Sequence, residues 1–197
     1  MPLGAFKAAL MGTAGVSTAN VVLLHDTDYS NASTASITSG IDSTYGVYIF
    51  KFYNINPATN SVDFTFQFNA AGASGYNETL TTTFFRSYHQ ENDGGAAGMG
   101  FQSGQSQGTA FNGGIGYQIG NEADESAVAE LHLFNPASTT YAKQWYVRSH
   151  SHAVGANDLS YETWYGGYIN TTTAIDDIQF KMSSGNFDGT IKMWGVK

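Results

Sequence analysis

The sequence predicts an all-β protein, an antiparallel jelly-roll-like β-sandwich with an extended N-terminal arm. The 197 residues include 13 Phe and 12 Tyr, and aromatic side chains favour the half-buried, pleated surface of a sheet. There are only 3 Pro but 23 Gly, and the Gly cluster with Asn, Ser and Asp, as they do in turns. No stretch shows a sustained helical period, whereas a two-residue period recurs along the chain.

The clearest predicted strand alternates apolar and polar side chains without a break. Its apolar members are Val62, Phe64, Phe66 and Phe68, and its polar members are Asp63, Thr65, Gln67 and Asn69. Because successive side chains of a strand point to opposite faces, we expect the apolar side to be buried and the polar side to face water.

Other segments extend this pattern to about eight to ten strands, with turns every 8–15 residues, as in a jelly-roll sandwich. Residues 45–55 are apolar on both faces apart from Lys51, which predicts a central strand. Residues 54–60 read as a turn, because Pro57 cannot continue a ladder. Residues 91–120 hold ten Gly and predict a long excursion with short pairings inside it. Further strands are expected at 21–26, 79–88, 127–134, 141–148, 161–169, 175–182 and 190–196, the last two as a closing hairpin joined by 183–189.

The chain divides into an arm at residues 1–20 and a β-sandwich domain at residues 21–197. The arm has some features of a signal peptide, but Gly12 and Thr13 interrupt its apolar run. The run is too short to span a membrane, so we expect no membrane partner. A stretch so rich in small residues is better suited to lying along another protein surface.

The net charge and the small number of charged residues limit the kinds of molecule that this protein can bind. The net charge is −8, from 8 basic and 16 acidic residues, and no basic cluster exists to neutralise phosphates, which argues against a nucleic-acid partner. Charged residues make up only 12% of the chain. Such a neutral polar surface is found on proteins that pack against copies of themselves or within an assembly, and also on secreted binding modules. Cysteine is absent, which excludes disulfides, thiolate catalysis and Cys-ligated zinc.

Catalytic motifs fail one by one, so we expect no enzyme activity and no cofactor. Asp176 and Asp177 are adjacent on a predicted strand and would point to opposite faces rather than flank one glycosidic bond. No Gly-x-Ser-x-Gly segment is present. The Gly-rich segment at 98–105 lacks the Lys-Ser/Thr ending of a phosphate-binding loop.

Two histidines are the candidate metal ligands. On a strand, the rings of His150 and His152 would share one face, and His89, Glu91 or Asp93 would have to supply a third ligand. Because sequence shows no such proximity, we favour structural or surface histidines and predict no metal. The acidic segments at 121–126 and 26–28 lack the spacing of a dedicated calcium loop, which favours solvated loop acids.

Trp145 and Trp164 are the candidate ligand-binding residues, because exposed aromatic side chains form sugar-binding platforms in sandwich lectins. The same alternation, in Trp145 with Val147 and in Trp164 with Tyr168, is typical of core. We favour the core interpretation for both.

Several segments over residues 45–197 carry a family resemblance. They are Tyr48–Asn60, Phe84–His89, Gly120–Ser126, Leu133–Tyr141 and the closing Gly167–Ile175, Ile178–Asn186 and Gly189–Gly195. In these segments the chain resembles virion structural proteins of marine tailed phages, especially those infecting cyanobacteria. The ending resembles the terminal hairpin of phage head-decoration and tail-appendage proteins.

The resemblance implies a non-catalytic protein on the outer surface of a phage particle. It implies first a capsid decoration (cement) protein, a homotrimer that binds the major capsid protein, and we expect the loops and the arm to make this contact. The alternative is a tail-fibre or appendage adhesin that binds a host surface glycan. Residues 1–40 lie outside the resemblance, so the attachment role of the arm rests on composition alone.

Overall fold

The computed structural model describes residues 20–92, 95–102, 107–153 and 158–197, and in these ranges the chain is all-β. The strands are β1 (Val21–Ala32), β2 (Ala35–Ile37), β3 (Val47–Pro57), β4 (Val62–Ala70), β5 (Leu80–Gln90), β6 (Ala97–Phe101), β7 (Gln107–Gly108), β8 (Asn112–Ile119), β9 (Ala127–Phe134), β10 (Lys143–Ala153), β11 (Leu159–Ile169), β12 (Ile175–Met182) and β13 (Phe187–Val196). Within the described ranges, no helix is long and apolar enough to cross a membrane.

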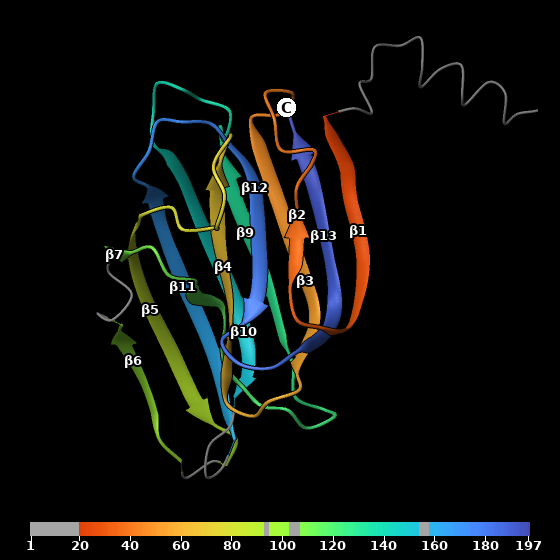
Figure 1. Ribbon diagram of the computed structural model, residues 1–197. Coiled ribbons are helices and arrows are strands. Elements are labelled where there is room, and N and C mark those ends of the chain that lie inside the picture. Colours follow the sequence, from red (N-terminus) through yellow and green to blue (C-terminus); the bar gives the residue numbers. More distant parts are fainter. Residues whose placement is uncertain (1–19, 93–94, 103–106, 154–157) are drawn as a thin grey trace, which may run out of the picture.

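The strands form one antiparallel sheet that curls almost into a closed barrel (Figure 1). Its main path runs β1-β13-β3-β9-β10-β8-β4-β12-β2, and β11, β5, β6 and β7 extend it from β10. The step from β10 to β8 rests on one residue pair, Ala153 with Ile119, so the sheet folds over at this point. We call β1, β13, β3, β9, β10, β11 and β5 the broad wall, and β8, β4, β12 and β2 the narrow wall.

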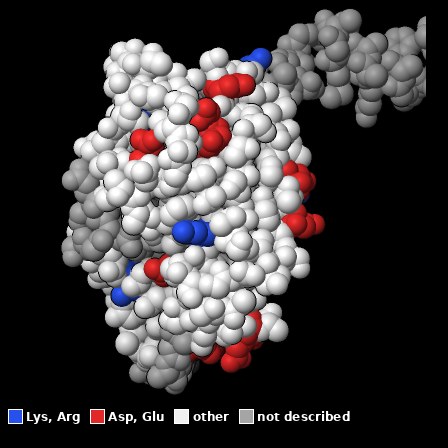
Figure 2. Space-filling view, in the orientation of Figure 1, with Lys and Arg blue, Asp and Glu red and all other residues white. Residues whose placement is uncertain are grey.

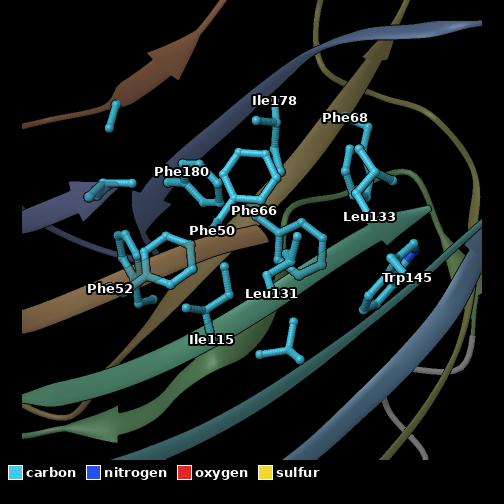
Figure 3. Packing of buried hydrophobic residues seen from close by; sticks show 14 of the residues in the cluster. Phe50, Phe52, Phe66, Phe68, Ile115, Leu131, Leu133, Trp145, Ile178 and Phe180 are labelled. Atoms are coloured by element: carbon cyan, nitrogen blue, oxygen red, sulfur yellow. The ribbon is translucent and has the colours of Figure 1, made fainter. Parts of the chain in front are cut away.

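The core fills the space between the two walls and is rich in phenylalanine and isoleucine (Figure 3). Phe180 of the narrow wall lies with its ring centre 5.0 Å from that of Phe52 on the broad wall. Phe66 of the narrow wall meets Trp145 of the broad wall edge-on, also at 5.0 Å. Each large apolar side chain contributes about 1.5–3 kcal/mol on burial. Alternating strands of the broad wall and of the narrow wall therefore each turn an apolar face toward the same core.

The expected closing hairpin is wrong. β12 pairs with β4 and β2, whereas β13 pairs with β1 and β3, so the two final strands belong to opposite walls. Both strands bury an alternating apolar face, Phe180 on one and Met193 on the other. Two alternating strands joined by a short loop predict a hairpin. Here the connection at 183–186 instead crosses from the narrow wall to the broad wall, so that the apolar faces of β12 and β13 cover the core from opposite sides.

The polar side of β4 is buried, not exposed as its alternation predicts. Thr65, Gln67 and Asn69 are only 4%, 0% and 4% exposed. The Gln67 side-chain nitrogen lies 3.0–3.1 Å from the carbonyl oxygens of Glu78, Thr109 and Ala110, in the segments before β5 and β8. These segments fold over the outside of β4, and Gln67 satisfies their backbone groups.

Several other boundaries differ from expectation. The turn predicted at 54–60 is wrong, because β3 continues to Pro57, with a bulge between Phe52 and Ile55 and a left-handed Asn54. The strands at 127–134 and 175–182 are confirmed to the residue, and the excursion at 91–120 contains β6, β7 and β8. β3 is central, as predicted, between β13 and β9. The N-terminal arm lies outside the described residues, apart from Asn20.

Replacing Gln67 with alanine tests whether the outside of β4 is covered. Removing the buried amide leaves up to three partly buried carbonyls without this donor, so we expect Gln67→Ala to lower the free energy of unfolding by about 1–2 kcal/mol. Urea denaturation followed by tryptophan fluorescence measures this. Gln179→Ala is the matched control, because Gln179 lies directly opposite on β12 and donates its side-chain hydrogen bond to the exposed Ser36 hydroxyl. Equal, small losses for both variants would mean that Gln67 faces water.

Candidate functional site

The broad wall presents a large outer face on the side away from the core. In β10 the alternation is complete from Lys143 to Ala153, with odd-numbered side chains buried and even-numbered ones exposed or half-buried. Because β1, β13, β3, β9 and β10 lie side by side, their outward side chains line up in rows across the wall.

Two of these rows are largely apolar. The first contains Leu23, Trp194, Ile49, His132 and Tyr146, and the second contains Val21, Val196, Val47 and Phe134; we call these nine side chains the outer band. The rings of His132 and Tyr146 stack with centres 4.6 Å apart. Val21, Leu23 and Tyr146 are 55%, 47% and 46% exposed and the other six side chains are half-buried, so the outer band is an apolar strip that is most exposed at its two ends.

The next row contains Asp26, Lys192, Lys51, Glu130 and Arg148, and we call these five side chains, together with Glu162 beside Arg148, the charged row. Three ion pairs join Lys192 to Asp26, Lys51 to Glu130 and Arg148 to Glu162, with N–O distances of 2.9, 2.9 and 2.5 Å. Three acids and three bases make the charged row neutral as a whole. A second surface approaching the outer band therefore meets no net charge from this row.

Glu130 is the most heavily paired member of the charged row. Partial burial acts to raise its pKa, but hydrogen bonds from His132 and Lys51 outweigh burial and hold the pKa of Glu130 below its ordinary value. The hydrogen bond between Lys51 and Glu130 also raises the pKa of Lys51 above its ordinary value. Glu130 thus ties the charged row to His132 of the outer band.

The structure separates the two candidate tryptophans. Trp145 points inward and is 2% exposed, between Phe66 and Tyr165. Trp164 points outward, where its ring stacks almost parallel on that of Phe85 at 5.0 Å. Phe85 is 39% exposed. The favoured core interpretation is therefore right for Trp145 and wrong for Trp164, because β11 turns its even-numbered side chains outward.

The two candidate histidines lie at the end of β10 and share one face of the strand, as expected, and this is the outer face of the broad wall. His152, Glu91 and Asp158 each place a possible ligand atom within 4.8 Å of the others. His150 lies one row away and makes a 2.8 Å hydrogen bond to the Ser160 hydroxyl. Of the third ligands named from the sequence, Glu91 joins the group, His89 lines the same hollow, and Asp93 lies outside the described residues.

Acidic side chains in the two segments considered for calcium make ion pairs or hydrogen bonds within the protein. Asp26 is paired with Lys192, and Asp28 accepts a 2.6 Å hydrogen bond from the Thr190 hydroxyl. Glu125 is buried and accepts a 2.7 Å hydrogen bond from the backbone N–H of Glu122.

Sequence reasoning missed the outer band and Asp158. The apolar character of both faces of 45–55 was the available signal for the outer band, but burial in the middle of a sheet explains it equally well. Asp158 comes next to His152 only through the pairing of β10 with β11, which local spacing does not show.

Comparisons with known proteins give no relative: no protein-family model, curated protein or solved structure matches the chain.

Neutralising Glu130 tests the coupling within the charged row. We expect Glu130→Gln to lower the free energy of unfolding at pH 7 by about 0.5–1 kcal/mol, a small value because water screens the partly exposed pairs. The pKa of Glu130 is depressed in the folded state, so its contribution is present above the ordinary Glu pKa and is lost as pH falls through the folded-state value. Urea titrations at pH 7 and pH 3 should show the difference from wild type shrinking at pH 3. Glu122→Gln, on an exposed loop, is the control, and a difference independent of pH would contradict this account.

Proposed function

We propose that this chain is a non-enzymatic structural component of a tailed-phage virion, a capsid decoration (cement) protein on the outer surface of the head. The proposal starts from the residue resemblance over 45–197. Because β12 and β13 do not pair, the closing segment contributes to that resemblance through its residues and not through a hairpin. The fold and the outer face add support that is independent of the resemblance.

The pairing pattern supports the jelly-roll part of the proposal. Setting aside β5–β7 and β10–β11 leaves eight strands in chain order: β1, β2, β3, β4, β8, β9, β12 and β13. They pair first with last, second with seventh, third with sixth and fourth with fifth, as β1·β13, β2·β12, β3·β9 and β4·β8. This nested pairing is what a long hairpin gives when it rolls up into a jelly roll, an architecture used by viral capsid and lectin domains.

The outer band is the observation that carries an assembly role. A strip of nine side chains, with its charged neighbours already paired, offers apolar area without net charge. Exposed strips of this kind mark interaction surfaces. We assign the strip to contact between copies of the chain in a homotrimer, because an electrically neutral surface can face its own copies without repulsion.

The rest of the surface fits a protein embedded in an assembly. Figure 2 shows the side of the molecule that carries β2, β12 and β4, where acidic side chains gather toward the ends and beside β1 and most of the area is uncharged. In the proposal the loops on this side, together with the arm at 1–20, contact the major capsid protein. Neither a nucleic acid nor a membrane has a part in it.

One observation favours the alternative, a tail-fibre or appendage adhesin that binds a host surface glycan. The stacked rings of Trp164 and Phe85 lie on the outer face, and Arg148 lies directly opposite Trp164 on β10. Aromatic faces beside hydrogen-bonding side chains suit a sugar ring. The decoration role is preferred because the outer band combines nine side chains from five neighbouring strands, whereas the stacked pair consists of two side chains.

The oligomeric state tests the assembly role. We expect native mass spectrometry of the wild-type protein to give three times the chain mass of 21.1 kDa. Tyr146→Glu places a charge in the outer band and should yield monomer. Tyr141→Glu is the matched control, because Tyr141 is 74% exposed and lies outside the outer band, and it should leave the trimer intact. A wild-type monomer, or equal effects of the two variants, would rule out this interface.

Two further measurements separate the decoration role from the adhesin role. Cryo-electron microscopy of the particle that carries this chain should show it on the head, and density only on the tail would favour the adhesin. A glycan array should give no signal for the wild-type protein. Binding that is lost in Trp164→Ala but kept in Tyr141→Glu would establish the adhesin instead.

A further inference from the structure

We propose that Glu91, His152 and Asp158 form a binding site for a divalent first-row transition-metal ion. The site does not depend on the virion role proposed above. It lies at one end of the outer face, where the ends of β5 and β10 meet the start of β11.

Convergence of three segments is the first observation. Glu91 follows β5, His152 belongs to β10 and Asp158 precedes β11, yet their ligand atoms all lie within 4.8 Å of one another. Two ligands of one tetrahedral ion lie about 3.4 Å apart when each bond is about 2.1 Å long. To reach this spacing from 4.8 Å, each pair of ligand atoms has to approach by at most about 1.4 Å, which side-chain rotation can supply.

The backbone around the three residues is fixed by hydrogen bonds. The Glu91 N–H donates to the Asp158 carbonyl at 3.1 Å, which links two of the ligand residues directly. The His152 N–H donates to the Ser126 carbonyl at 3.0 Å, and the His152 carbonyl accepts from the Gly120 N–H at 3.2 Å. Each ligand residue is therefore anchored through its main chain while its side chain stays available.

Charge gives the site its preference for a cation. Among the described residues, no ion pair joins Glu91 or Asp158 to Lys or Arg, unlike the acids of the charged row. Two carboxylates within 4.8 Å of each other repel, and a divalent cation between them would remove that repulsion.

The donor set selects the class of metal. One imidazole nitrogen with two carboxylate oxygens suits zinc, manganese or iron, whereas calcium prefers oxygen donors throughout. His89 and His150 line the same hollow, and the Ser160 hydroxyl orients His150. These two imidazoles lie in the same hollow as the three ligand residues, and water would complete the coordination of the ion.

The bound ion would tie β10 and β11 to the end of β5. These three strands lie outside the eight that form the nested pairs. The ion would therefore hold β5, β10 and β11 together at one end of the broad wall. An ion that binds only the folded chain raises its melting temperature. With free zinc at about 100 times its Kd, the expected rise for a chain of this size is about 5–10 °C.

Zinc titration of the full, untagged chain tests the proposal. We expect isothermal titration calorimetry to show one Zn²⁺ per chain and differential scanning fluorimetry to show the rise in melting temperature, reversed by EDTA. His152→Ala should weaken zinc binding at least tenfold, and Glu91→Gln or Asp158→Asn should weaken it similarly. His25→Gln is the matched control, because His25 lies on β1, outside both the outer band and the three ligand residues, and it should bind zinc like wild type.

Two results would overturn the site. One is the absence of stoichiometric zinc binding by the wild-type chain. The other is zinc binding by His152→Ala that equals wild type while circular dichroism shows both to be folded. If His152→Ala does not fold, Glu91→Gln decides the matter, because it keeps the size of the side chain and removes only its charge.

Discussion

The contact between the phenylalanines of the two walls is the interaction on which the rest of the structure depends. Phe180 of the narrow wall lies 5.9 Å from Phe50 and 5.0 Å from Phe52 of the broad wall, measured between ring centres. It also stacks on Phe64 of its own wall at 6.1 Å. A sheet buries this cluster only by curling over it, which fixes which face of every strand points inward.

Fixing the inward faces also fixes the outer ones. Tyr146 and Trp164 point outward because Trp145 and Tyr165 point inward beside Phe66. The outer band, the stacked pair of Phe85 and Trp164, and the group around His152 all follow from this one constraint. The assembly and metal-binding proposals therefore use different parts of one face and can succeed or fail separately.

Local pattern was sufficient for some features and insufficient for others. Alternation predicted the all-β class and the inward row of Phe64, Phe66 and Phe68, because a period of two depends on neighbouring residues alone. Pairing depends on distant residues, which is why the closing strands read as a hairpin although they belong to opposite walls. Gln67 reads as solvent-exposed because nothing in its own strand shows that two later segments cover it. Asp158 joins His152 only through sheet register.

Hydroxyl-radical footprinting of the assembled protein tests the central claim most directly, namely that the outer band is where copies of the chain meet. We expect Leu23, Tyr146 and Trp194 to be protected in the concentrated protein and to become reactive on dilution. Met99 and Tyr141, each 74% exposed and outside the outer band, should react equally in both states. Outer-band side chains that react as fully as Met99 at every concentration would contradict the account.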